Sequence, residues 1–239
     1  MIKPASLQEQ AYKIILRKII YSDFAPGQKI SENELGQVLS MGRTPIREAL
    51  LQLRKQGLIH VVPQSGTYVS KIDLKSADNA RFTREQLEQK IMLECLMKID
   101  DQGLKALKCI IEKQCQAAFE QNKRDFFFFD NVFYKTCFEI AGREEIWRWM
   151  NKSNTHLERF RWLRIVTKEL DWAKITNQHK KILDTIFTKD VDEMNFLIMS
   201  HLHMMLDEKD FVVSKYPDYF LSEDDANSQD ISELDFNGF

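Results

Sequence analysis

The chain has 239 residues, of which 44% are hydrophobic and 29% are charged, so it can bury the core of one large or two small domains. It has no apolar stretch long enough to cross a bilayer, we expect no signal peptide, and its four cysteines lack CxxC spacing. These features exclude a membrane-spanning protein, disfavour a disulfide framework or a zinc site built on cysteines, and predict a cytoplasmic location with free thiols.

The formal net charge of −2 conceals an uneven distribution along the chain. Residues 1–75 carry 11 Lys and Arg against 6 Asp and Glu, residues 76–206 carry 21 against 20, and residues 207–239 carry 2 against 10. The positive N-terminal part is typical of a domain that binds nucleic acid. The acidic tail, residues 221–239, has few apolar side chains, and we expect it to lack regular structure. We interpret this tail as passive, although it could also repel non-specific nucleic acid.

The N-terminal part begins with an apolar periodicity that predicts a helix over 10–21, followed by a turn over 23–27. A second helix is expected to start at Ser31, because its hydroxyl can act as the N-cap. Glu34 lies three residues further on and can complete a capping box. The second helix has one apolar side, formed by Leu35, Val38 and Leu39.

Gly42 follows the second helix, at a point where the chain often needs a positive φ. We expect Thr44 to cap a third helix, with Pro45 at its first position. Arg43 and Arg47 lie at the start of this helix, where they could pair with phosphates or with guanine bases. The alternative is an ordinary surface helix with solvated arginines. The residues spaced to face a core are Ile46, Ala49, Leu50 and Leu53.

The next segment favours the DNA-binding interpretation. Residues 58–62 and 67–71 are β-prone runs separated by a four-residue turn over 63–66, which predicts a β-hairpin. A helix–turn–helix followed directly by a hairpin is the winged form of this motif. The tip of the wing could contact DNA through Gln64, Ser65 and the backbone of Gly66.

Residues 7–72 resemble the winged-helix domain of the GntR family of bacterial transcription regulators. The resemblance implies that the residues matching the DNA-contacting positions of the family do the same here: Arg43, Thr44, Arg47 and Gly66. Two positions depart from the family pattern, because Asn33 replaces an arginine of some members and Gly42 replaces a small hydroxyl residue. The matching segments are Pro26-Gly27, Glu34-Leu35, the run from Arg43 to Leu50, Leu53, Gly57-Leu58-Ile59 and Gly66-Thr67-Tyr68-Val69.

The rest of the chain is predicted to be helical, because residues 75–210 contain hardly any Gly or Pro and show a recurring 3.6-residue periodicity. We expect an all-α bundle, connected to the winged helix by a linker at 72–76. The six expected helices cover approximately 76–100, 102–121, 123–141, 143–166, 170–188 and 190–210.

Four polar side chains could converge inside this bundle. Asp130 and Tyr134 lie one turn apart on the same helix face. His179 and His201 lie at similar distances from the break near Lys189, so an antiparallel hairpin would bring them level. One carboxylate and two imidazoles would suit Zn²⁺, Ni²⁺ or Mn²⁺. The alternative is that the histidines are hydrogen-bonded core groups or surface residues.

Residues 77–206 are similar to the FCD ligand-binding domain of the FadR-like branch of the family. In metal-binding members, one Asp and three His hold a divalent ion, and Asp130, His179 and His201 match three of these ligands. The fourth position is occupied by Tyr134. The matching segments are Arg84-x-x-Leu87-Glu88, Asp130-x-x-Phe133, Ala141-Gly142, His179-x-x-Ile182 with Ile186 and Asp190, and His201-Leu202.

The tyrosine leaves three arrangements open. A metal ion could be held by three protein ligands plus water or an effector carboxylate, Tyr134 could coordinate as phenolate, or the site could lack metal and Tyr134 could hydrogen-bond a ligand. We favour the first slightly over the third and rank phenolate last, because a phenol has a pKa near ~10.

Arg84 matches a family arginine that reaches the effector pocket, and together with Tyr134 it is our candidate for binding a carboxylate effector. The alternative for Arg84 is a salt bridge to Glu88 on the next turn. The arginines of one later helix could line the same pocket or form a solvated face: Arg159, Arg161 and Arg164.

We therefore expect a mainly α protein, with a winged helix-turn-helix domain at 1–72 and an all-helical effector-binding and dimerisation domain at 77–210. The predicted function is that of a ligand-responsive transcription regulator, not an enzyme, which binds an inverted-repeat operator as a homodimer and responds to a small organic acid. One alternative is a metal-dependent enzyme that uses Asp130, His179 and His201. Another is a constitutive DNA-binding dimer with a vestigial pocket.

Overall fold

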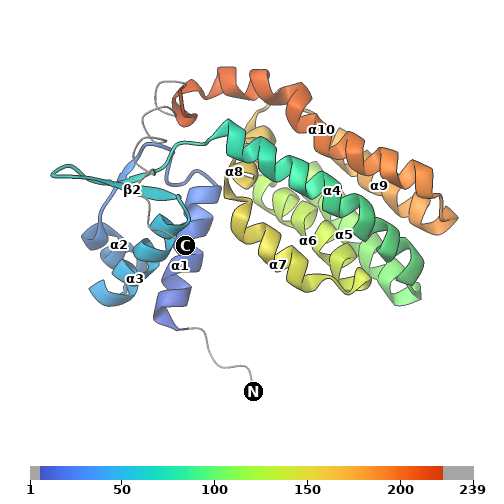
Figure 1. Cartoon of the computed structure of the whole chain (residues 1–239), viewed down its shortest axis with the longest axis horizontal. Coiled ribbons are helices and arrows are strands. Elements are labelled where there is room, and N and C mark those ends of the chain that lie inside the picture. The colour runs from blue at the N-terminus through green and yellow to red at the C-terminus, as the bar shows by residue number, and fades with distance from the viewer. Residues whose placement is uncertain (1–5, 223–239) are drawn as a thin grey trace, which may run out of the picture.

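The computed structural model describes residues 6–222, which form ten α-helices and one small sheet (Figure 1). The mainly helical fold class expected from the sequence is confirmed. No helix in this range is both long enough and apolar enough to cross a membrane. The predicted tail at 221–239 lies outside the described residues, except for its first two positions.

The N-terminal part is a three-helix unit with a three-stranded antiparallel sheet in the order β1-β3-β2. Strand β1 was not expected from the sequence. It forms because the chain leaving the turn at 23–27 extends along β3, pairing Lys29 with Tyr68 and Ile30 with Thr67. The elements are α1 (Leu7–Ile20), β1 (Lys29–Ile30), α2 (Glu32–Leu39), α3 (Arg43–Lys55), β2 (Ile59–Val62) and β3 (Gly66–Val69).

The turn between α2 and α3 differs from the expectation in two details. Ser31 caps α2 as predicted, since its Oγ accepts a hydrogen bond from the Glu34 N–H at 3.1 Å. The residue that takes the positive φ after α2 is Ser40, with φ of 52°, because α2 ends at Leu39 and Ser40 is its C-cap. Gly42 has φ of −65° and is itself the N-cap position of α3, so the predictions of a positive φ at Gly42 and of Thr44 as N-cap are wrong.

A shared apolar core holds the N-terminal part together. The side of α3 that was predicted to face a core is buried, with each of its four apolar residues at most 6% exposed. By contrast Val38, which was expected to help form the apolar side of α2, is 67% exposed. The buried residues of α1, α3 and the wing include Ala11, Ile15, Ile19, Ile46, Ala49, Leu50, Leu53, Leu58 and Val69.

The C-terminal part is a bundle of seven helices, not six. The helix expected over 143–166 is interrupted at buried Asn154, where two poor helix formers, Ser153 and Asn154, follow each other. The elements are α4 (Leu74–Lys98), α5 (Asp101–Phe119), α6 (Lys123–Ala141), α7 (Glu144–Ser153), α8 (Thr155–Val166), α9 (Ala173–Thr188), α10 (Val191–Lys215) and the short 3₁₀ turn η1 (Pro217–Tyr219).

Helix α8 lies where the two parts meet, and it contacts α1, α4, α6 and α10 (Figure 1). The Tyr21 ring, just after α1, packs against Trp162 of α8 with ring centroids 4.7 Å apart. Arg124 Nη2 also donates to Asp23 Oδ1 at 2.7 Å. The bundle and the winged helix therefore share a packed contact that is centred on α8.

Candidate functional site

The start of α3 presents exposed, unpaired cations to solvent. Arg43, Thr44 and Arg47 are all exposed in its first turns. Neither arginine makes an ion pair with any residue in the range 6–222. A helix N-terminus with two free guanidinium groups is suited to binding phosphates and base edges.

The wing has a backbone geometry that depends on glycine. Gly66 has φ of +143°, and a Cβ built on it would lie 2.6 Å from Cε of Lys29. Gln64 also has a positive φ, and the Ser65 hydroxyl is 2.6 Å from the Tyr68 hydroxyl. Of the wing-tip residues named from the sequence, Ser65 is therefore engaged within the wing, and Gly66 shapes the turn.

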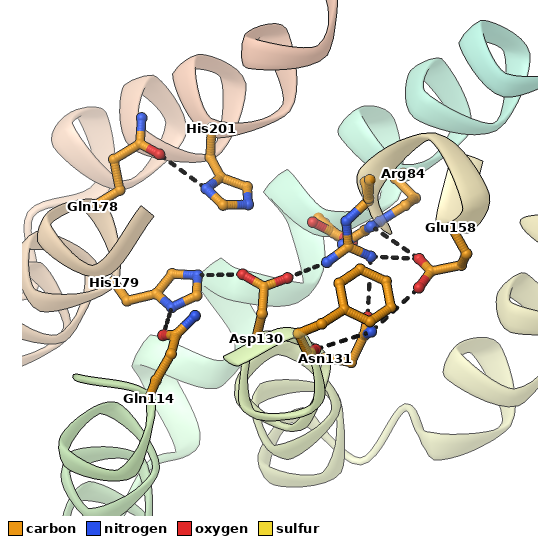
Figure 2. A network of polar contacts seen from close by, with 11 residues as sticks. Arg84, Gln114, Asp130, Asn131, Glu158, Gln178, His179 and His201 are labelled. Atoms are coloured by element: carbon orange, nitrogen blue, oxygen red, sulfur yellow. Dashed lines mark hydrogen bonds and ion pairs between the residues drawn. The ribbon is translucent and has the colours of Figure 1, made fainter. Parts of the chain in front are cut away.

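Inside the bundle, Asp130 of α6, His179 of α9 and His201 of α10 lie together (Figure 2). One ligand atom from each lies within 4.8 Å of the others. All three side chains are buried, and His179 Nε2 is 3.5 Å from Asp130 Oδ1. The convergence expected from their spacing around Lys189 is present in the fold.

Two glutamines fix the orientation of the imidazole rings. Gln114 Oε1 lies 2.7 Å from Nδ1 of His179, and Gln178 Oε1 lies 2.9 Å from Nδ1 of His201 (Figure 2). An amide oxygen can only accept, so each Nδ1 carries the proton and each Nε2 keeps its lone pair. Supporting hydrogen bonds of this kind are typical of histidines that bind metals. Sequence reasoning did not identify either glutamine.

The charges of the three side chains suit a metal centre at neutral pH. Burial lowers the pKa of His179 to about 4 and places that of His201 well below its usual range. Burial alone would raise the pKa of Asp130, but Arg161 and the neighbouring imidazoles outweigh burial and lower it to about 2. The site therefore contains one carboxylate and two neutral imidazoles.

Several buried atoms at this centre lack hydrogen-bond partners within the described part of the chain: Asp130 Oδ1, His179 Nε2 and Tyr134 Oη. Burying such groups without a partner is costly. A divalent cation coordinated by oxygen and nitrogen would satisfy the first two. The residues present thus fit a divalent metal ion.

Tyr134 lies directly beside both histidines. Its ring centroid is 5.5 Å from that of His179 and 5.3 Å from that of His201. Burial, reinforced by the Glu88 and Asp130 carboxylates, raises the pKa of the phenol well above 10. Tyr134 is therefore a neutral phenol, which disfavours coordination as phenolate and leaves a hydroxyl that can donate.

Arg161 of α8 contacts the carboxylate of this centre. Its Nη2 pairs with Oδ2 of Asp130, and its Nη1 contacts Glu158 and donates to Asn131 Oδ1 at 3.0 Å. The adjoining cavity of about 50 Å³ is lined by Asp130, Arg161 and His201, among others. This volume has room for one or two water molecules but not for an organic acid.

Arg84 adopts the salt bridge that was the alternative to effector binding. Its Nε donates to Glu88 Oε1 at 2.6 Å, and its guanidinium lies 5.5 Å from the centre of the Tyr134 ring. Both Nη atoms are buried without a hydrogen-bond partner among the described residues, although Nη1 is 3.8 Å from a Glu158 oxygen. Arg84 does not line the small cavity beside Asp130.

The other two arginines of α8 have separate roles. Arg159 Nη2 donates to the carbonyl of Ser70 at 2.5 Å, and Arg164 pairs with Glu208 of α10. His156, at the start of α8, accepts a hydrogen bond from the Asp73 N–H through Nδ1 at 2.9 Å. The solvated face considered for these arginines is therefore absent from the described structure. One side of α8 contacts the Asp130 centre, and its N-terminal half contacts the segment that follows the wing.

A basic winged helix attached to a helical bundle with a buried polar centre defines a class of DNA-binding regulators with a sensor domain. Comparisons with known proteins agree. Residues 7–69 match the model for bacterial regulatory proteins of the gntR family, and residues 81–204 match the FCD domain.

The chain is 26% identical over 220 residues to the HTH-type transcriptional repressor RspR of Escherichia coli K12, covering 91% of this chain and 95% of that protein. It is also 26% identical over 212 residues to an uncharacterised HTH-type transcriptional regulator of Streptomyces ambofaciens, covering 89% of each. The solved structure of E. coli McbR/YncC has the same fold, with a TM-score of 0.75 at 17% identity, covering 89% of this chain and 99% of that one.

The chain belongs to the GntR family and carries an FCD effector-binding domain. It is a transcription regulator, and the metal-dependent enzyme considered from the sequence is not supported, because the sequence relatives are regulators.

Proposed function

We propose that this regulator binds an inverted-repeat operator as a homodimer and that Arg43, Thr44, Arg47 and Gly66 contact the DNA. The observation that carries the DNA contacts is the pair of exposed, unpaired arginines at the start of α3. Winged helices of this kind read one half-site each, so a two-fold dimer reads a symmetric site. We assign the DNA-binding role to residues 1–72, and effector binding and dimerisation to residues 77–210.

Asp130, His179 and His201 would hold a divalent ion, with Zn²⁺, Ni²⁺ and Mn²⁺ as candidates. This assignment is supported by the two glutamines that orient the imidazoles and by the unpartnered atoms at the centre. A bound ion would supply a Lewis-acidic position for a water molecule or an effector carboxylate. Tyr134 would then donate a hydrogen bond to that ligand instead of coordinating the ion.

The proposed effector is a small organic acid, and its binding would require Arg161 to move. The cavity of about 50 Å³ is too small for such a molecule while Arg161 pairs with Asp130. An incoming carboxylate can replace Asp130 as the partner of Arg161, which would open the site. Both Nη atoms of Arg84 lack hydrogen-bond partners among the described residues, and Arg84 is a second candidate for the carboxylate.

Helix α8 offers a physical route from this centre to the DNA-binding part. Arg161 lies two residues from Arg159, which holds the carbonyl of Ser70, and five residues from His156, which holds the N–H of Asp73. A shift of α8 that releases Arg161 from Asp130 would therefore also disturb the segment after the wing. Coupling of this kind changes DNA affinity when effector binds, and DNA changes effector affinity by the same factor.

The experiment that tests this proposal combines DNA selection with a ligand screen. Purified protein should enrich inverted repeats from random duplexes, and small carboxylates should be screened by thermal shift with and without Zn²⁺ or Ni²⁺, since a true ligand stabilises the fold by mass action. A stabilising acid that also changes affinity for the selected repeat supports the proposal. Tight DNA binding that no acid or metal alters would favour a constitutive regulator with a vestigial pocket.

A further inference from the structure

After α10, the chain turns back and is fixed to the segment between the two domains. Phe220 forms a parallel β-bridge with Ile72, and the hydrogen bonds Ile72 N–H to Tyr219 O and Leu221 N–H to Ile72 O measure 2.8 and 3.0 Å. Ile72 is fully buried and Phe220 is 3% exposed. The described chain thus ends beside the base of the wing, not at the far end of the bundle (Figure 1).

The sequence that continues from this anchor is strongly acidic. Residues 223–239 contain six Asp and Glu and no Lys or Arg, and they lie outside both family matches. A segment of 17 residues can extend at most about 60 Å. The wing from Ile72 to Gly66 spans only about 20 Å at the rise of a β-strand. The DNA-binding surface is therefore within reach of this segment.

The positive charge of α3 is not neutralised by ion pairs within residues 6–222. In the bundle, many arginines face carboxylates within the same fold, as Arg84 faces Glu88 and Arg164 faces Glu208. On α3, the exposed cations make no ion pair with any residue of the described range: Arg43, Arg47, Arg54 and Lys55. These four positive charges of α3 are thus available to a polyanion.

We propose that residues 223–239 dock on the basic surface of α3 and the wing and compete there with DNA. The carboxylates of this segment would take the place of backbone phosphates, and the anchor at Phe220 would keep their effective concentration high. Binding to arbitrary DNA depends almost entirely on phosphate contacts, whereas an operator adds base contacts. The segment would therefore suppress non-specific binding more than operator binding, and so increase selectivity.

The proposal rests on DNA binding by the winged helix, and its test keeps the two apart. Three proteins are compared: the full chain, a chain ending at Ser222 that retains the anchor, and a full-length chain with the acids replaced by amides. Fluorescence anisotropy measures their affinity for a short duplex of arbitrary sequence over a range of salt concentrations. The amide substitutions are E223Q, D224N, D225N, D230N, E233Q and D235N.

Both altered chains should bind this duplex more tightly than the full chain, on the order of 3- to 10-fold at low salt. Their affinity should also fall more steeply with salt, because DNA then displaces small ions instead of the tethered carboxylates. Equal affinity of the three proteins would overturn the proposal. Absence of DNA binding by all three would instead contradict the DNA-binding function itself.

A second comparison separates docking from simple repulsion between the tail and DNA. Ending the chain at Ser222 is expected to increase its affinity for DNA, and this gain in affinity is measured again in two backgrounds. The first background carries R43Q and R47Q, and the control background carries K105Q and K108Q on the exposed surface of α5. Docking predicts that the gain shrinks in the first background and persists in the control. An unchanged gain in both backgrounds would show repulsion alone and would overturn the docking proposal.

Discussion

Arg161 and Asp130 form an ion pair that uses only one oxygen of the carboxylate. Oδ2 of Asp130 is held by Arg161, whereas Oδ1 faces His179 Nε2 at 3.5 Å and has no hydrogen-bond partner in residues 6–222. The carboxylate is thereby kept ionised and oriented, with one oxygen left to face the two imidazoles. Arg161 is thus a positioning residue for this centre and also a structural support.

Replacement of Arg161 by Met should strongly destabilise the fold. Asp130 and Glu158 would lose their buried partner, and removal of one member of a buried pair typically costs about 3–5 kcal/mol. The free energy of unfolding in urea measures this change. The matched control is Arg148→Met, because Arg148 pairs with Glu145 on the surface and both side chains are more than half exposed. A similar small loss in the two variants would contradict the structural role assigned to Arg161.

The stability of the fold should fall as the pH drops below neutral, and His156 should contribute to this fall. Burial, helped by Arg159, lowers the pKa of His156 to about 4, whereas an unfolded histidine titrates near 6.5. The unfolded chain thus binds the proton first. The contribution of His156 is complete above about pH 6.5 and is lost as the pH falls toward 4, by at most about 1.4 kcal/mol per unit.

The variant His156→Asn isolates this contribution. Asparagine can accept the same hydrogen bond from the Asp73 N–H through its amide oxygen, but it does not titrate. Urea unfolding between about pH 4.5 and 7.5 should give a shallower pH dependence for the variant than for the natural chain, with the two curves running parallel only above about pH 6.5. Parallel curves over the whole range would exclude His156 as a source of the slope.

The geometry of the wing should not tolerate a side chain at Gly66. Gly66→Ala would place a Cβ against Lys29 in a backbone conformation that residues other than glycine rarely adopt, at a cost of about 1–3 kcal/mol. The expected result is a lower melting temperature together with weaker DNA binding. Gly42→Ala is the control for steric strain, since Gly42 has an ordinary φ and its Cβ would meet nothing closer than 4.0 Å, so its cost should be limited to a weaker N-cap of α3. Equal tolerance at the two positions would argue against this wing geometry.

Removal of Gln114 should weaken metal binding without removing a ligand. Gln114→Leu would free the imidazole of His179 to rotate, and loss of such a supporting hydrogen bond typically lowers affinity about 10- to 100-fold. Competition with a chromophoric chelator measures Zn²⁺ affinity. Gln116→Leu changes an exposed residue of the same helix and should leave the affinity unchanged. If neither variant nor the natural chain binds Zn²⁺, Ni²⁺ or Mn²⁺, the metal proposal is wrong.

The sequence carried enough information for the secondary structure and for part of the site. Periodicity located the helices because each buries one face, and the similar distances of His179 and His201 from Lys189 placed them level in the fold. The break at Asn154 was missed because the apolar periodicity continues across it. Strand β1 was missed because two residues are too few to show an alternating pattern.

The partners of the site residues were harder to infer. Gln114 meets His179 from 65 residues away, and Arg161 meets Asp130 from 31 residues away. Neither spacing has a local pattern, because the first contact depends on how α5 packs against α9 and the second on how α8 packs against α6. Local spacing could therefore indicate which side chains converge, but it could not show what holds them or which arginine reaches the carboxylate.

DNA binding through Arg47 is the central claim, and the most direct measurement compares the natural chain with Arg47→Ala on a duplex enriched by the protein from random sequences. If Arg47 reads a base, the variant should lose about 1–3 kcal/mol of binding free energy, and affinity should fall steeply with salt. Arg148→Ala, an exposed arginine on the bundle, should bind as the natural chain does. Full affinity of Arg47→Ala, or binding that does not depend on salt, would contradict the assignment of α3 as the recognition helix.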